Sequence, residues 1–144
     1  MLKRRWIVGV LSIVVFLLGF SLGNVMQLGD VQAQSGKRVF EIRTYTTTPG
    51  SLQALSNRFG DHTMRIFERH GITNIGYFIP QGSDNQLIYI LAYPSREAAD
   101  KSWTAFRADP ERAKVFADSE INGKLIAEIS PSIWAEPTDY SPMK

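Results

Sequence analysis

The sequence contains no cysteine and only two histidines. A domain without cysteine has no disulfides, so its hydrophobic core must hold it together, and metal sites built on thiolates are excluded. The two histidines, His62 and His70, are not part of an H-E-x-x-H motif, and the sequence predicts no metal site. Residues 34–144 also lack G-x-S-x-G, P-loop and G-x-G-x-x-G motifs, which leaves a serine hydrolase or a nucleotide-binding protein without support.

Most of the chain carries equal numbers of basic and acidic residues. The formal net charge is +2 and the pI is about 9.0. The first 33 residues hold Lys3, Arg4, Arg5 and Asp30, and without them the 16 basic and 14 acidic residues become 13 of each. The basic pI therefore belongs to the N-terminal segment, and it gives no argument for a nucleic-acid partner.

The N-terminal segment has the pattern of an export signal. A basic start, Met1–Arg5, precedes the apolar run Ile7–Leu22, and the small residues Val31 and Ala33 suit a cleavage site after Ala33. We therefore expect residues 1–33 to be a signal peptide and the protein to be periplasmic or secreted. The alternative is an uncleaved membrane anchor within residues 6–29, since roughly 20 apolar residues can span a bilayer. Interruptions of the run favour cleavage: Gly23, Asn24, Gln27 and Gly29.

The remaining chain predicts one domain. We expect a linker at 34–37, a domain at 38–135 and an extended tail at 136–144. Val39 to Thr46 alternates as a strand does, and Pro49-Gly50 ends it. Ser51 is then placed to cap a helix that runs to about His70 and stops at Gly71.

Further elements follow in a regular order. The patterns predict strands at 72–80, 87–93 and 124–133, a helix at 96–108, and a short helix that begins at Asp109-Pro110 and includes Val115 and Phe116. The order is β-α-β-β-α-β, which is typical of the ferredoxin-like arrangement. The predicted fold class is α+β, with a four-stranded antiparallel sheet and the helices on one face.

The third predicted strand, Leu87–Tyr93, is apolar on both faces. Helices in this topology cover only one face of the sheet, and large exposed apolar patches are uncommon on monomers. We therefore expect a homodimer in which the other face meets a partner's sheet.

Four short segments resemble the NIPSNAP family. They are Glu41-Ile-Arg-Thr-Tyr45, Pro49-Gly50, Glu68-Arg-His-Gly71 and Ala108-Asp-Pro-Glu111. The resemblance implies a ferredoxin-like unit of the dimeric α/β-barrel superfamily. Relatives in that superfamily include cofactor-free monooxygenases and haem-degrading enzymes, whereas NIPSNAP members themselves are better described as interaction proteins.

His62 is the one candidate for a catalytic residue. It lies at helical spacing between Phe59 and Ile66, on the stripe that is expected to face the sheet. There it would be a general base or a ligand contact. The structural alternative is a histidine at the edge of the core, or one that is rotated to solvent with Thr63 inside. His70, at the helix C-terminus, needs no function beyond its interaction with the helix dipole.

Three further residues are candidates for ligand binding. Arg43 and Tyr45 share a strand face with Glu41, where they can orient an anionic or carbonyl-bearing ligand. The structural alternative is an Arg43–Glu41 ion pair inside a dimer barrel, with Tyr45 packed around it. Trp103 can stack on a ligand, although an aromatic residue at helical spacing with Ala99 and Phe106 is more often part of a core.

The sequence thus predicts an exported, dimeric small-molecule-binding or assembly module that needs no cofactor. The alternative is an oxygenase-type enzyme, cofactor-free or haem-using, in which His62, Tyr45 and Trp103 line an open cavity.

Overall fold

A computed structural model describes residues 37–144, and the predicted signal peptide or anchor lies outside this range. The elements are β1 Val39–Thr47, α2 Leu52–Arg58, η1 Phe59–Thr63, α3 Met64–Arg69, β2 Thr73–Phe78, β3 Gln86–Tyr93, α4 Arg96–Ala108, α5 Pro110–Ser119, β4 Ile126–Ile129 and β5 Ile133–Ala135. Within residues 37–144, no helix combines the length and hydropathy that a membrane span requires.

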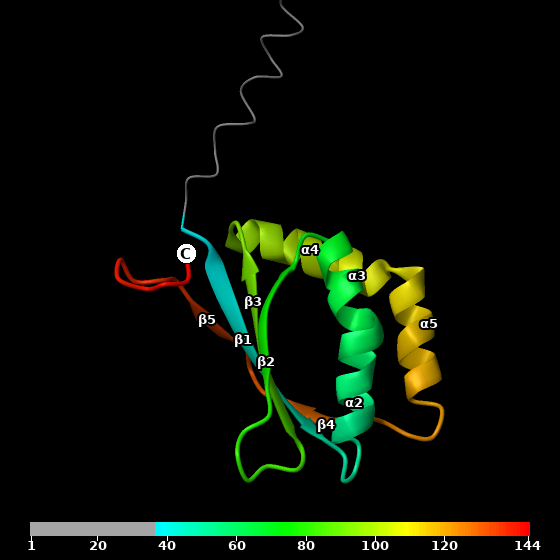
Figure 1. Cartoon of the computed structure of the whole chain (residues 1–144). Helices are drawn as coiled ribbons and strands as arrows, with labels where there is room; N and C mark the ends of the chain where they lie inside the picture. The colour runs from blue at the N-terminus through cyan, green and yellow to red at the C-terminus, as the bar shows by residue number, and fades with distance from the viewer. Residues whose placement is uncertain (1–36) are drawn as a thin grey trace, which may run out of the picture. The chain divides into compact units, whose positions relative to one another are not determined.

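The strands form one antiparallel sheet with β1 at its centre. The order is β2-β3-β1-β4, and β5 pairs with β1 beside β4. Figure 1 shows all the helices on one side of this sheet. The α+β class, the antiparallel sheet and the single helical layer predicted from the sequence are therefore confirmed.

The predicted last strand, 124–133, is wrong in one respect, because it is two short strands rather than one. β4 and β5 both pair with β1, and Ser130-Pro131-Ser132 separates them. Proline has no N–H to donate to the ladder, so Pro131 interrupts the pairing. The interruption leaves the Ser132 hydroxyl free to donate to Glu41 Oε1 at 2.7 Å.

The first helical stretch contains a π-helical turn, η1, between α2 and α3. Such a turn holds one more residue than an α-helical turn, so the side chains that follow it point in different directions from those of an uninterrupted α-helix. Phe59 and Thr63 are both buried against the sheet as a result, while His62 is exposed. The stretch ends at Gly71 with φ +74°, as the sequence predicts. Ser51 occupies the N-cap position but makes no capping hydrogen bond.

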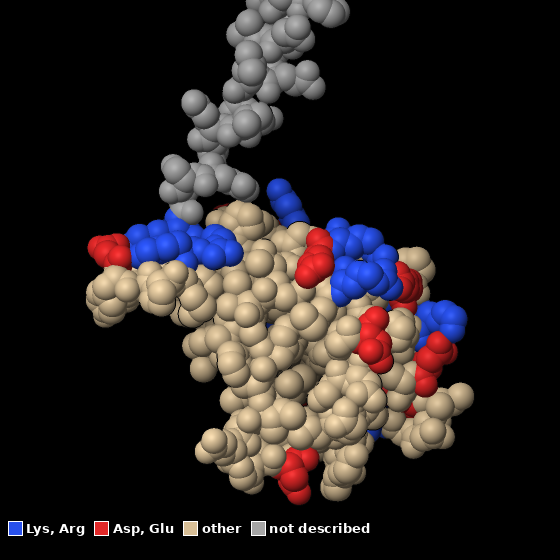
Figure 2. Space-filling model, viewed as in Figure 1, with Lys and Arg blue, Asp and Glu red and all other residues tan. Residues whose placement is uncertain are grey.

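Asp109 fixes the corner between α4 and α5. Its carboxylate accepts hydrogen bonds from the N–H groups of Glu111 and Arg112, as the predicted N-cap should. It also accepts from Arg69 at 2.6 Å and contacts His70 Nε2 at 2.6 Å. Asp109 therefore ties the end of α3 to the start of α5. In Figure 2 charged side chains gather over the helices and, in a second group, where the tail meets the start of β1, and the surface between the two groups is largely uncharged.

The two faces of the sheet differ in what covers them. The helices bury an aromatic core against the inner face, with Phe67, Tyr89 and Tyr93 among its fully buried members. The opposite face is also apolar, and its residues alternate with the buried ones in the strands. Part of it is covered by tail residues 136–143, which pack over Phe40.

Candidate functional site

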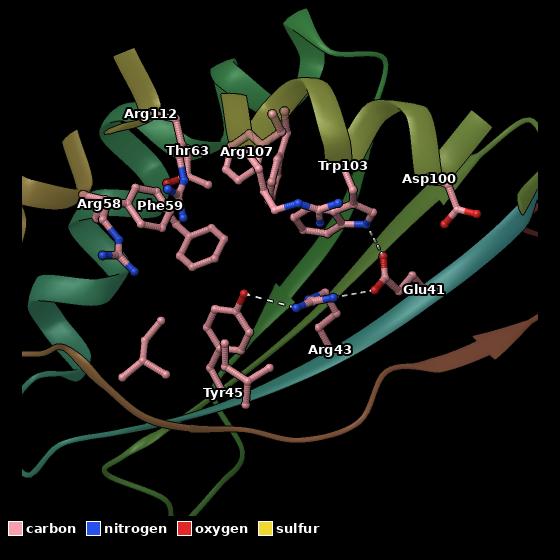
Figure 3. A pocket seen from close by; sticks show the side chains of 15 residues that line it. Glu41, Arg43, Tyr45, Arg58, Phe59, Thr63, Asp100, Trp103, Arg107 and Arg112 are labelled. Atoms are coloured by element: carbon pink, nitrogen blue, oxygen red, sulfur yellow. Dashed lines mark hydrogen bonds and ion pairs between the residues drawn. The ribbon is translucent and has the colours of Figure 1, made fainter. Parts of the chain in front are cut away.

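A cavity of about 330 Å³ lies between the inner face of the sheet and the helices. Figure 3 shows side chains from β1, from the first helical stretch and from α4 converging on it. Its lining comprises Glu41, Arg43, Tyr45, Arg58, Phe59, Thr63, Phe67, Asp100, Trp103, Phe106, Arg107, Arg112, Phe116, Ile126 and Ile129. These residues come from both ends of the domain sequence, so only the fold assembles the site.

Glu41 is the most constrained polar group of the cavity, with 1% of its surface exposed. Its Oε1 accepts from Arg43 at 2.6 Å and from Ser132 at 2.7 Å. Its Oε2 accepts from Tyr93 at 2.8 Å and from Trp103 Nε1 at 2.9 Å. A carboxylate has about four lone-pair sites, so all the accepting capacity of Glu41 is used inside the protein.

These contacts decide the protonation state of Glu41. Burial acts to raise the pKa of the carboxyl, but the hydrogen bonds from Ser132, Arg43 and Trp103 and the charge on Arg43 outweigh it, so the pKa lies below its usual value. A carboxylate with a lowered pKa and no free lone pair is a poor general base. Glu41 is therefore suited to holding other side chains in place.

Arg43 is the main side chain that Glu41 holds. Its Nε donates to the Tyr89 hydroxyl at 2.9 Å, and its guanidinium lies 4.7 Å from the Trp103 ring centroid and 5.6 Å from that of Tyr45. Figure 3 shows the guanidinium beneath the indole, between Glu41 and Tyr45. A guanidinium fixed on several sides is a rigid wall with a hydrogen-bonding edge.

A pair of arginines, Arg58 and Arg112, lies at the end of the cavity opposite Arg43. The guanidinium carbons of Arg58 and Arg112 lie 4.1 Å and 4.0 Å from the centroid of the Phe116 ring. Arg58 is 3% exposed and donates to Glu120 at 3.1 Å and to Ser119 at 3.2 Å. No carboxylate of residues 37–144 forms an ion pair with Arg112.

Three buried side-chain atoms in the described chain have no hydrogen-bond partner. They are Arg58 Nε, Thr63 Oγ1 and Arg112 Nε, and all three residues line this one cavity. Buried polar groups are nearly always hydrogen-bonded, so a cluster of exceptions in a single place calls for an explanation.

Three of the four predicted site residues line the cavity, and His62 does not. Arg43, Tyr45 and Trp103 lie together at the cavity, and the predicted Arg43–Glu41 ion pair is present, on the face beneath the helices. Of the two placements left open for His62, the structure has the second: His62 is exposed and the π-helical turn directs Thr63 inward, so His62 does not face the sheet. His62 lines a surface groove between the first helical stretch and α5.

Sequence reasoning missed two arginines of the site and the role of Glu41. Arg58 lies three residues after the buried Leu55 on α2, a spacing that places both side chains on one face of the helix. Arg112 was not singled out, although its spacing of four from Phe116 on α5 was a usable signal for a cation above a ring.

The cavity lining does not fit a haem. Haem iron is held in proteins by histidine, cysteine, methionine or tyrosine, and Tyr45 is the one such residue here, with its ring packed against Phe59 and Tyr89. No group of three potential metal-ligating side chains occurs in residues 37–144 either.

Comparisons of the sequence and of the structure with known proteins find the same family. The profile of the NIPSNAP family matches residues 40–142. A crystal structure of a NIPSNAP family protein with unknown function from Agrobacterium tumefaciens str. C58 is 23% identical, with a TM-score of 0.66 over 76% of this chain and 96% of that chain. An uncharacterized NIPSNAP-like domain protein from Burkholderia xenovorans is 20% identical, with a TM-score of 0.64 over 74% and 90%.

A structure described as a putative antibiotic biosynthesis monooxygenase from Chloroflexus aurantiacus J-10-fl is more distant. It is 16% identical, with a TM-score of 0.50 over 74% of this chain and 99% of that chain. No curated protein matches the sequence. At these identities the solved structures support the fold alone.

Proposed function

This chain belongs to the NIPSNAP family, and we propose that it is a small-molecule-binding protein whose ligand occupies the cavity between the helices and the sheet. The observation that carries this proposal is the way the cavity is built. Its polar wall, Arg43, is held by Glu41, Tyr89 and Trp103 in a position that no free side chain would keep. Such rigid preorganisation is typical of binding sites, because it lowers the entropic cost of holding a ligand.

The cavity offers little for catalysis. Its buried carboxylate already accepts four hydrogen bonds, and the candidate base predicted from the sequence, His62, lies in a different groove. The other carboxylate of the lining, Asp100, is exposed to solvent. Tyr45 and Trp103 do line an open cavity, as the oxygenase alternative requires, but that alternative loses its proton acceptor. The geometry therefore favours binding over turnover.

A fragment screen by NMR tests this proposal. Trp103 lines the cavity, and its Nε1–H donates to Glu41 there. Trp134 does not line the cavity and packs against Tyr93 and Arg96. We expect hits from a library of small aromatic and aliphatic compounds to shift the Trp103 indole resonance in a saturable way and to leave that of Trp134 in place. A library without such a hit at millimolar concentration would contradict the proposal. The variant Trp134→Phe is the control for assignment.

We also propose that the domain works outside the cytoplasm. The proposal depends on the basic start, apolar run and Val31-Gln32-Ala33 site of the sequence. N-terminal sequencing of the exported protein tests it, with Gln34 as the expected first residue. A cytoplasmic protein that begins at Met1 would show it to be wrong.

A further inference from the structure

We infer that the ligand is a small organic anion, with a carboxylate that binds between Arg58 and Arg112 and a flat apolar body in the rest of the cavity. This inference rests on the proposed function and adds the chemical class of the ligand.

The cavity carries an excess of positive charge. Four arginines line it, against two acidic residues, Glu41 and Asp100. Glu41 is committed to Arg43, and Glu120 outside the lining is committed to Arg58. In residues 37–144 no carboxylate forms an ion pair with Arg107 or Arg112. An anion would therefore restore the local balance of charge.

The excess is sharpest at Phe116, where two guanidiniums lie within about 4 Å of one ring. Burial lowers the pKa of Arg58, and the nearby charge of Arg112 acts in the same direction. Glu120 offsets the charge of Arg58, whereas no carboxylate of residues 37–144 pairs with Arg112, so one positive charge beside the ring lacks a counter-ion. An anion shared by the two arginines would supply it. Arginine is the side chain best suited to such sharing, because its planar fork matches a carboxylate.

The unpartnered atoms lie in the same place. Arg58 and Thr63 are 3% and 1% exposed, and each has a polar atom without a partner within the described chain. The π-helical turn brings these two residues, five apart, to the same side of the helix. Arg58 Nη1 already donates to Ser119 and Glu120. The donors without an acceptor at this end are therefore Arg58 Nε, Arg112 Nε and the Thr63 hydroxyl, and a carboxylate supplies acceptors only.

The other lining residues indicate the size and polarity of the rest of the ligand. Tyr45 and Phe59 lie between Arg58 and Arg43 in Figure 3. The cavity is also lined by the apolar side chains of Phe116, Ile126 and Ile129. A volume of about 330 Å³ lies at the lower end of the roughly 300–1,000 Å³ range of ligand pockets. One or two rings, or an equivalent aliphatic group, would fill it.

Isothermal titration calorimetry with 4-nitrobenzoate and 4-nitrobenzamide tests the inference, because the two compounds share a shape and differ in charge. We expect 4-nitrobenzoate to bind the purified protein with a Kd about tenfold lower or more, as hydrogen bonds to a charged group predict. The variant Arg112→Met should remove that preference. Lys114→Met is the matched control, since it deletes a charge two residues away on the exposed side of α5, and it should keep the preference.

Each other outcome would overturn the inference. Equal affinity for the two compounds would show that the cavity does not select anions, while the proposed function would stand on the NMR result. The same would follow if neither compound bound although other fragments shifted Trp103, or if Arg112→Met kept the preference. Arg112→Lys, which retains the charge, guards against misfolding of the Met variant and should keep part of the preference.

Discussion

Trp103 Nε1 donates a hydrogen bond of 2.9 Å to Glu41 Oε2, which joins α4 to the central strand β1. The same carboxylate forms an ion pair with Arg43 at 2.6 Å, so a single side chain holds both the helix wall and the strand wall of the cavity. Its removal should affect stability and binding together.

The substitution Glu41→Gln is expected to destabilise the protein by about 3 kcal/mol, because it leaves the largely buried charge of Arg43 without a partner. Urea unfolding followed by circular dichroism measures the change. Glu128→Gln on β4, where the glutamate is exposed, is the control and should stay within about 0.5 kcal/mol of the native protein. A variant at Glu41 as stable as the control would show that the network adds no stability.

Thr63→Val should stabilise the free protein. The two side chains have nearly the same shape, and the substitution removes a buried hydroxyl without a partner, which costs about 1 kcal/mol or more when left unsatisfied. The same change should weaken ligand binding, since the hydroxyl belongs to the set of free donors. Thermal unfolding with and without a ligand from the NMR screen separates the two effects.

The exposed Thr104 gives the control for this substitution, because its hydroxyl donates to the carbonyl of Asp100 instead of lying unpaired. Thr104→Val should leave ligand affinity unchanged. A loss of stability in Thr63→Val would mean that the hydroxyl has a partner in solution.

Acid should weaken the contacts by which Asp109, at the corner between α4 and α5, holds the end of α3. Hydrogen bonds from His70 and Arg69 hold the pKa of Asp109 far below its usual range. A lowered pKa in the folded state stabilises the fold fully above the unfolded pKa, which is about 3.9 for aspartate, and the contribution is lost as the pH falls below that value. Asp109→Asn should therefore lower the urea midpoint at pH 7, and the difference from the native protein should shrink at pH 3.

The exposed Asp118, which pairs only with Lys114, serves as the control. Asp118→Asn should shift the midpoint little at either pH, since exposed ion pairs contribute little. A difference for Asp109→Asn that is as large at pH 3 as at pH 7 would assign the effect to the capping bonds rather than to the charge.

We propose that the outer face of the sheet forms a homodimer. Ile42, Ile88 and Ile90 lie on this face, and Phe78 and Ile133 beside them are 53% and 62% exposed. Light scattering should give a dimeric mass at micromolar concentration, and Ile88→Glu should give a monomer. Ile121→Glu, at an 81% exposed position near the end of α5, should leave the mass unchanged. A monomeric native protein would contradict the proposal.

The sequence by itself determined the elements and their order. Period-two alternation in Val39–Thr46, the left-handed Gly71 and the Asp109-Pro110 start of α5 depend on interactions between residues close in the chain, which local patterns record directly. The pairing of Glu41 with Arg43 was also foreseeable, since residues two apart in a strand share a face. The break at Pro131 could have been anticipated from proline's missing donor.

The tertiary structure decided which further side chains join Arg43, Tyr45 and Trp103 at the cavity. The π-helical turn differs from an α-helical turn by one residue, and packing of Phe59, Thr63 and Phe67 against the sheet selects it, which directs His62 away from the cavity. Arg58 and Arg112 are more than fifty positions apart in the chain and meet only at Phe116. The contact of Arg58 with Phe116 depends on how α2 and α5 pack on the sheet, and no spacing within one helix encodes it.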